Sequence, residues 1–310
     1  MQLRRQRTRC RLRLLNRQHR IPRIHLRARP FKRRPCRSRT RYNAPLRTAG
    51  SKVTIAHAGA WVLGVALLLF LAVPIILLVV LGGSGIGGAL RDRDMIAALE
   101  TTFVTATVAT LLAALCGSPI AYALSRTRFR GRAVIAAIVD LPLLIPHPVA
   151  GIAILLLVSR DTAFGSTLLD LGLRVVGTPA GIVAAMLFVS APLYVSAARE
   201  AFARVDKRYE FVARTLGDTS WSAFRRVTFP LARRGLASAA IVTWARAVSE
   251  FGAVVVLAYN PKVVSVLSYD RFTTGGLRDA LPIAATLVVV SIVPLLALRA
   301  LRYDRSNEAV

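Results

Sequence analysis

The chain has 310 residues, of which 55% are hydrophobic, yet it carries 43 Lys and Arg residues against 15 Asp and Glu residues. A soluble domain does not usually combine such apolarity with so large a net charge, and the conflict disappears when the chain is divided into two parts. Residues 1–50 hold 18 of the basic residues and no acidic residue, whereas the part from Ser51 onward is only mildly basic. The three cysteines form no CxxC pair, so neither a disulfide framework nor a zinc site is predicted.

Residues 1–52 form a basic tail that mixes Arg with Pro, Ser and Gln and sustains no apolar period. Such a segment cannot bury enough surface to offset its ordering entropy, so we expect disorder. We interpret the tail first as the product of a start site assigned too far upstream. The second interpretation is an anchor attracted to anionic membrane lipid, and the third is a nucleic-acid-binding arm. It is not a signal peptide, because its charged region is too long and no short apolar core with a cleavage site follows.

Six apolar runs follow, each near the roughly 20 residues that an α-helix needs to cross a bilayer core about 30 Å thick. They lie at about His57–Leu81, Ile96–Leu124, Ala133–Val158, Ala180–Ala198, Leu236–Ala258 and Ala280–Leu301. A soluble helical protein does not account for so many runs, so the sequence predicts an all-α integral membrane protein with six transmembrane helices. Its predicted parts are a first helix and outer loop (53–95), a core of five helices (96–302) and a tail (303–310).

The basic residues between the spans predict the orientation. If the N-terminus is cytoplasmic, the inside segments are Ser125–Arg132, Arg199–Gly235 and the tail from Arg299, and they carry 16 basic residues. The outside loops carry 7. The positive-inside rule therefore predicts a multi-pass protein of the inner (cytoplasmic) cell membrane with both termini in the cytoplasm.

The long inside segment at 205–230 is predicted to form two short helices. The first is indicated by apolar residues at helical spacing, which are Val205, Tyr209, Val212 and Leu216. Asp206 is its candidate N-cap, and Gly217 is the candidate left-handed residue that ends it. A second helix follows with Thr219 or Ser220 as its N-cap, and we expect Pro230 to stop this helix before the next span.

Trp221, Phe224 and Val227 are expected on one side of the second helix, next to two arginines. Exposed aromatic side chains with flanking positive charge suit docking into a groove on another protein. The alternative is that these side chains pack on the cytoplasmic ends of the spans. Periodicity alone does not separate the two.

The stretch YEFVARTLGDTSWSAFRRVTFP (209–230) resembles the EAA loop of ABC-importer permeases. In that family the pattern is EAA, three residues, Gly, nine residues, then I-x-L-P. Ala213 matches the third position and Gly217 follows at the required spacing. At the end of the pattern, Val227 and Phe229 stand where Ile and Leu are usual, and Pro230 matches. The front departs from the pattern, because Glu210 lies one residue upstream of the usual acidic position.

Two further segments, DLPLLIPHPVAGIAILLL (Asp140–Leu157) and WARAVSEFGAVVVLAYNPKVVSVLSYDRF (Trp244–Phe272), are similar to spans of molybdate and tungstate permeases. The matches cover about Ile96 to Leu301. The resemblance implies a type I ABC importer (MetI-like) architecture without a cofactor. The implied partners are a second copy of this subunit, a cytoplasmic ABC ATPase dimer and an external oxyanion-binding protein. The implied ATPase-coupling residues are Glu210, Ala213, Gly217, Trp221, Phe224, Val227 and Pro230.

The chain is not expected to be an enzyme. A P-loop needs Gly-Lys followed by Ser or Thr, because the Lys neutralises phosphate charge and the hydroxyl holds magnesium. None of the four lysines follows a glycine. We therefore expect ATP hydrolysis on a partner ATPase subunit.

Arg246 and Glu250 lie within the fifth predicted span, four residues apart and so on one helix face. Each charge would cost about 2.5–3.5 kcal/mol at a helix centre, so both should face the bundle interior or a wet path. They form either a structural ion pair or part of the path or gate for a divalent anion. His147, between two prolines of the third span, is a further path candidate, with packing as the alternative.

These observations favour the permease of an ATP-driven importer for tungstate or molybdate. A sulfate or thiosulfate permease of the same class is the nearest alternative. An ion-coupled secondary transporter is a second alternative, although that class usually shows internal repeats, and we find no clear repeat. A membrane-tethered nucleic-acid binder that uses the tail is a third.

Overall fold

The computed structural model describes the backbone of residues 52–307 and, apart from parts of the C-terminal helix, the side chains from Ala60 onward. Residues Ala58–Val310 form one compact unit. The basic tail predicted over 1–52 lies almost wholly outside the described residues, as does part of the tail predicted over 303–310.

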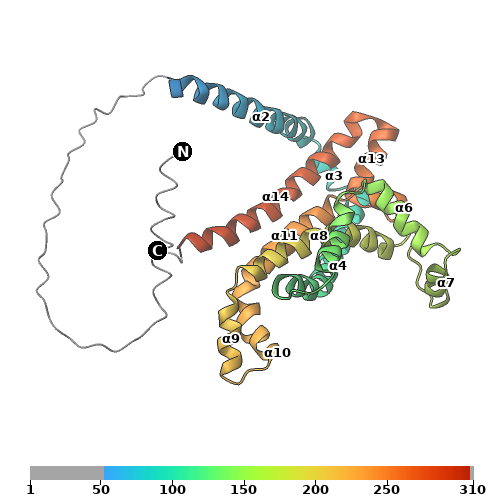
Figure 1. The fold of residues 1–310 in the computed structure, drawn as a ribbon. Helices are drawn as coiled ribbons and strands as arrows, with labels where there is room; N and C mark the ends of the chain where they lie inside the picture. Colours follow the sequence, from blue (N-terminus) through green and yellow to red (C-terminus); the bar gives the residue numbers. More distant parts are fainter. Residues whose placement is uncertain (1–51, 308–310) are drawn as a thin grey trace, which may run out of the picture. The chain divides into compact units, whose positions relative to one another are not determined.

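The described chain is built from helices, as the sequence predicts, and Figure 1 shows their course. In chain order they are α2 (Lys52–Gly83), α3 (Ile86–Ala89), α4 (Arg93–Arg126), α5 (Arg132–Asp140), η1 (Leu141–Leu143), α6 (His147–Val158), α7 (Ala163–Asp170), α8 (Pro179–Ala203), α9 (Lys207–Thr215), α10 (Ser220–Ala223), η2 (Phe224–Thr228), α11 (Phe229–Val248), α12 (Gly252–Leu257), α13 (Val264–Gly275) and α14 (Leu277–Asn307).

Three of the described helices are long and apolar enough to cross a bilayer, and they are Ala60–Gly83 within α2, α4 and α8. A fourth candidate is the bent pair formed by Arg132–Leu143 and His147–Val158. The fifth and sixth predicted spans form the helices α11 and α14, but neither passes the same test of length and apolarity. The prediction of six spans is therefore not confirmed.

The third predicted span is not one continuous helix. Its two halves meet at a bend of 111° between Leu143 and His147. Pro142, Pro146 and Pro148 lie at this point, and because proline has no N–H to donate, the helical hydrogen bonds cannot continue through it. The span predicted over Ala133–Val158 is therefore a bent pair of helices, with His147 between two prolines at the start of the second one.

The fifth predicted span is also interrupted. The helix α11 ends at Val248 and α12 begins at Gly252, so Glu250 lies in the break rather than within a helix. Arg246 is in the last turn of α11. The prediction that both residues lie on the face of one helix is therefore wrong. Non-helical backbone at membrane depth is tolerated where protein buries it, and Glu250 is fully buried.

Helices α4, α8 and α11 pack side by side and form the centre of this compact unit (Figure 1). Small residues allow this close approach, as is usual between membrane helices. A Cβ atom on Gly235 of α11 would stand only 2.5 Å from the Cβ of Ala201 on α8. Between α4 and α8, Gly117 faces the side chains of Tyr194 and Val195 in the same way.

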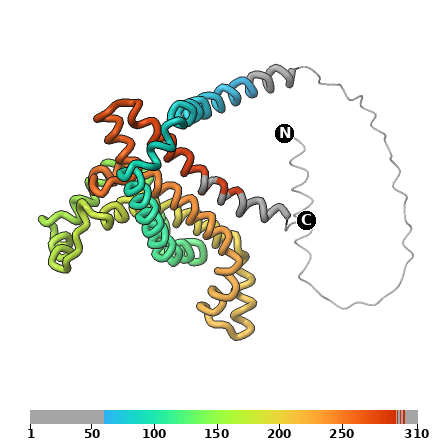
Figure 2. Tube along the Cα trace, turned by 180° about the vertical axis from the view of Figure 1, so that it is seen from behind, coloured from blue at the N-terminus to red at the C-terminus, as the bar shows by residue number. Residues whose placement is uncertain are grey.

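The helices α9 and α10 lie at one end of this central group, and α13 lies at the opposite end in both views (Figures 1 and 2). The segment predicted to be inside and the loop predicted to be outside are thus separated by the length of the central helices.

Candidate functional site

The helix α9 begins and ends where the sequence predicts. Asp206 is its N-cap, and its Oδ1 atom accepts a hydrogen bond from the backbone N–H of Arg208 at 2.9 Å. Gly217 follows the helix in the left-handed region, with φ at 101°. The N–H of Asp218 then donates to the carbonyl oxygen of Ala213 at 3.1 Å, which satisfies a carbonyl at the helix end.

The second helix does not stop at Pro230. Thr219 caps α10 as predicted, by accepting from the N–H of Ser222 at 3.2 Å. The chain then passes through the π-helical turn η2 directly into α11. Pro230 lies in the first turn of α11, directly after the π-helical turn, and the helix continues past it. The expected break at this proline is therefore wrong, and the second helix is continuous with α11.

The apolar face predicted for α9 does not pack inward. Val205 is buried but precedes the helix, whereas the later members of the pattern are exposed. We call the exposed set the α9–α10 surface, and it comprises Tyr209, Phe211, Val212, Leu216 and Trp221. Contiguous exposed apolar side chains mark interaction sites on proteins.

The aromatic residues of the second helix divide between the two predicted roles. Trp221 is 69% exposed and belongs to the α9–α10 surface. Phe224 packs instead on the helix ends, with its ring 4.8 Å from that of Tyr122 and 6.1 Å from that of Phe202. Of the other predicted coupling residues, Ala213 is buried, Val227 is half-buried and Pro230 is exposed.

Glu210 points inward, away from the α9–α10 surface. Its carboxylate forms an ion pair with Nε of Arg126 at 3.1 Å and accepts hydrogen bonds from the hydroxyls of Tyr122, at 3.2 Å, and Thr228. Sequence reasoning missed these three partners. The one available signal was a basic residue just after the second apolar run, Arg126.

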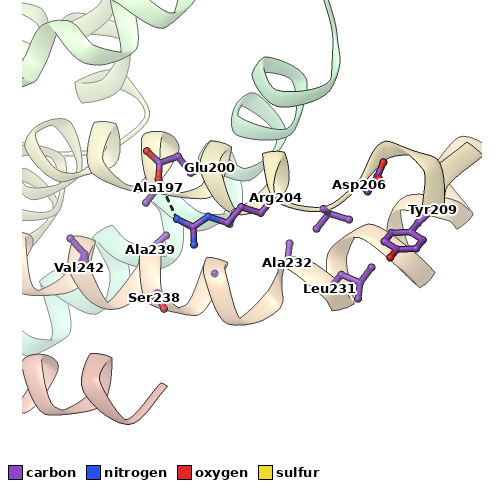
Figure 3. Close-up of a pocket in the computed structure, with 13 residues that line it drawn as sticks. Ala197, Glu200, Arg204, Asp206, Tyr209, Leu231, Ala232, Ser238, Ala239 and Val242 are labelled. Atoms are coloured by element: carbon purple, nitrogen blue, oxygen red, sulfur yellow. Dashed lines mark ion pairs between the residues drawn. The ribbon is translucent and has the colours of Figure 1, made fainter. Parts of the chain in front are cut away.

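A groove of about 730 Å³ lies next to this segment, between α8 and α11 (Figure 3). Small side chains such as Ala197 and Ala239 line its floor. Arg204 reaches back along α8 to Glu200, with 3.8 Å between the charged atoms, and both side chains are mostly exposed. The sequence analysis did not indicate this groove.

The structure brings together His147, Arg246 and Glu250, the three residues predicted to line a path or gate. Nη2 of Arg246 lies 2.7 Å from Oε2 of Glu250 and 2.9 Å from Nδ1 of His147. The same carboxylate oxygen lies 3.4 Å from Nδ1 of His147. Both breaks in the predicted spans therefore meet at one charged cluster.

Glu250 is held from several sides. Its Oε1 accepts from the N–H of Ala253 at 2.9 Å, and its own carbonyl accepts from the Ser265 hydroxyl at 2.7 Å. The side chains of Arg246 and His147 are partly exposed and border an open depression with Ser249 and Phe251. The cluster thus has a fixed, buried acid and a more accessible cation. Within the described residues, no group of three or more His, Cys, Asp or Glu side chains could hold a metal ion.

A second charged group lies in the loop after α12 and on α13. The Asp270 carboxylate accepts from Nζ of Lys262 at 2.7 Å and from the Tyr259 hydroxyl at 2.5 Å. The hydrogen bond from Lys262, followed by that from Tyr259, lowers the pKa of Asp270 below its ordinary value. The bond to Asp270 in turn raises the pKa of Tyr259.

Residues 110–303 match the family described as the inner membrane component of binding-protein-dependent transport systems. The chain belongs to this family. This inner membrane component is 42% identical to the molybdate/tungstate transport system permease protein WtpB of Thermococcus kodakarensis. The match covers 74% of this chain and 89% of that protein. It is 37% identical to WtpB of Methanocaldococcus jannaschii over 74% of this chain and 89% of that protein. A sulfate transport system permease protein, CysT of Escherichia coli, is 30% identical over 69% and 78% of the two chains.

Solved structures support the same fold for this inner membrane component. A chain of a bacterial alginate ABC transporter, in complex with an alginate-bound periplasmic protein, superposes with a TM-score of 0.62, at 18% identity, over 79% of this chain and 92% of that one. A chain of the inward-facing MetNI methionine ABC transporter gives a TM-score of 0.55, at 18% identity, over 69% and 99%. The predicted family and the predicted MetI-like, all-α permease fold are confirmed.

Proposed function

We propose that the chain is the membrane-spanning subunit of an ATP-driven importer for molybdate or tungstate. The observation that carries the proposal is the 37–42% identity to four proteins named molybdate/tungstate permeases, each over about three quarters of this chain. Family members are membrane components, so ATP hydrolysis is assigned to a separate cytoplasmic ATPase dimer. An external oxyanion-binding protein would deliver the substrate, and two copies of this chain would form the path.

A sulfate permease is the second candidate. It is supported by the 30–31% identity to sulfate permeases, which is lower than the identity to the molybdate/tungstate group. Molybdate, tungstate and sulfate are all tetrahedral dianions, so the same charged path could serve each of them. The ranking therefore depends on overall similarity and not on one residue.

The α9–α10 surface is the proposed docking site for the ATPase. The side chains of Trp221, Tyr209 and Leu216 are exposed on it, and it lies at one end of the central helices. Aromatic anchors of this kind dominate the affinity of protein interfaces. Because the segment continues through η2 into α11, motion of a docked ATPase would act directly on a helix of the core. We assign this segment and both termini to the cytoplasmic side, because the segments on that side carry more basic residues.

The cluster of His147, Arg246 and Glu250 is the proposed path or gate. A lone buried carboxylate would repel a dianion, but the guanidinium of Arg246 neutralises Glu250 and remains partly exposed. Transport requires weak and transient binding, which a compensated cluster provides better than an isolated cation. The two chain breaks at this point supply backbone that can change conformation.

Reconstitution tests the proposal. The chain is placed in liposomes with its ATPase and binding protein, and uptake of labelled molybdate and tungstate is followed with sulfate as competitor. We expect uptake that requires ATP and that excess sulfate reduces little. Preferential uptake of sulfate would favour the second candidate, and accumulation without the ATPase would overturn the proposal.

A further inference from the structure

A buried polar cluster links α9 to the end of α4. The Arg126 side chain is 6% exposed and that of Glu210 is 17% exposed, so the ion pair between them is largely shielded from water. Tyr122, one turn earlier on α4, donates to the other carboxylate oxygen of Glu210. Thr228 of η2 donates to the oxygen that faces Arg126. One carboxylate therefore joins three elements.

Polar contacts, rather than apolar packing, hold α9 in place. Its larger apolar side chains, Tyr209 and Val212, are exposed. At its N-terminal end, Nη1 of Arg126 donates to the carbonyl oxygen of Val205 at 2.8 Å, and Lys207 donates to the carbonyl oxygen of Arg126 at 3.1 Å. These contacts all converge on the last turn of α4.

The guanidinium of Arg126 is incompletely used in this conformation. Its Nε and Nη2 atoms are buried, and neither has an acceptor with hydrogen-bond geometry among the described residues. An arginine fork can bind a carboxylate through two parallel hydrogen bonds, but Glu210 meets only one edge of it. A small displacement of α9 would therefore change how many of the Arg126 donors the carboxylate satisfies.

We propose that Arg126 and Glu210 are positioning residues that transmit motion of the α9–α10 segment to α4. The inference rests on the proposed function. The segment is covalently continuous with α11, which provides one route into the core. The buried ion pair provides a second route, into the helix that packs against both α8 and α11. With both routes, displacement of the segment moves two core helices together instead of bending one.

Conservative substitutions test the link in the reconstituted complex of permease, ATPase and binding protein. Arg126→Gln and Glu210→Gln each remove one charge, and the double variant Arg126→Glu with Glu210→Arg restores the pair with reversed signs. We expect each single variant to retain the ATPase and its ATP hydrolysis but to lower the oxyanion transported per ATP about tenfold. The reversed pair should recover part of the lost transport per ATP. A role in folding alone would change the amount of folded protein, and not the oxyanion transported per ATP.

A matched control is available on α8. Glu200 and Arg204 form an exposed pair at the same end of the molecule (Figure 3), so Glu200→Gln and Arg204→Gln should leave the transport ratio unchanged. If the reversed pair fails to fold, Tyr122→Phe removes one hydrogen bond to Glu210 and keeps the aromatic packing. An unchanged transport ratio in Tyr122→Phe and both single variants would overturn the proposal. The proposal would also be overturned if the transport ratio fell in parallel with the amount of bound ATPase, because Glu210 would then contact the partner directly.

A distance measurement separates this inference from the proposed substrate. Spin labels at Arg208→Cys on α9 and Arg128→Cys just after α4 report whether the two elements move together when the complex binds ATP. We expect a constant distance in the parent chain and a distance that changes in Glu210→Gln. A distance that changes equally in both overturns the link. If the parent complex transports no molybdate or tungstate, the proposed substrate fails while this test still decides the link.

Discussion

Gly252 lies so close to His147 that a Cβ atom at position 252 would stand 2.8 Å from the Cβ of His147. The first residue begins α12 and the second begins α6, so the two half-helices start side by side although they come from different predicted spans. Gly151 repeats the approach one turn later, where an added Cβ would stand 2.8 Å from the carbonyl oxygen of Ala253. This contact brings His147 to Arg246 and Glu250.

Gly252→Ala should destabilise the protein by about 1–3 kcal/mol, because the added methyl group meets the first turn of α6, including Pro148, and the backbone must shift. Thermal unfolding in detergent measures the effect. Gly64→Ala is the control, since nothing lies within 4 Å of a Cβ at that helical position. The control should be neutral or more stable by up to about 1 kcal/mol. Equal unfolding temperatures for the two variants would contradict the close approach.

Gly217→Val should impair the α9–α10 segment. The residue has φ at 101°, and a side chain in this region costs about 1–2 kcal/mol. We expect normal membrane insertion but less oxyanion uptake per ATP in reconstituted vesicles. Gly131→Val introduces similar strain, at φ 91°, in the other predicted inside segment and should leave the coupling ratio near that of the parent. The same loss in both variants would indicate a general effect of strain.

Arg246→Gln and Glu250→Gln should each reduce the yield of folded protein more than the double variant does. Each single change leaves a charge without its partner, at a cost of about 3 kcal/mol, whereas the double change leaves two neutral amides. Size-exclusion profiles and unfolding temperatures in detergent measure assembly. Equal values for all three variants would exclude a structural ion pair. Uptake measurements would then test the role of these residues in a path or gate.

Trp221→Ala should weaken the association with the ATPase about 30-fold or more, because a large exposed aromatic side chain at a docking site is a typical anchor. The ATPase retained on the immobilised permease is the measurement. Trp61→Ala is the control, since Trp61 is similarly exposed, at 73%, on the apolar helix α2. Retention equal to that of the control would place the ATPase elsewhere.

Lys262→Met should lower stability at neutral pH and have less effect in acid. The pKa of Asp270 is depressed in the folded state, so its contacts stabilise the fold above the ordinary carboxyl pKa. This contribution is lost as the pH falls through the depressed pKa, and the gap between the unfolding temperatures of variant and parent should close.

The pH control is Lys207→Met. Lys207 donates to a backbone carbonyl, which does not titrate, so its effect should not vary with pH. A gap for Lys262→Met that stays constant down to about pH 2.5, well below the ordinary Asp pKa, would contradict the assignment.

Local signals were sufficient for both ends of α9 and for the start of α10. Asp206, Gly217 and Thr219 act on backbone groups within a few residues, so their effect could be predicted without knowledge of the rest of the fold. Pro230 misled the same analysis, because a proline that ends one helix and a proline in the first turn of another look alike in sequence.

Apolar length was sufficient to predict a helical membrane protein from the sequence alone, and the resemblance of residues 209–230 to the EAA loop was sufficient to predict a permease. Only the tertiary structure decided that Glu210 turns inward to Arg126 and that the breaks at His147 and Glu250 meet. The physical reason is the distance along the chain over which each interaction acts. Capping, hydropathy and helical period act over a few turns of one segment, whereas these contacts join residues from different helices and depend on how the helices pack.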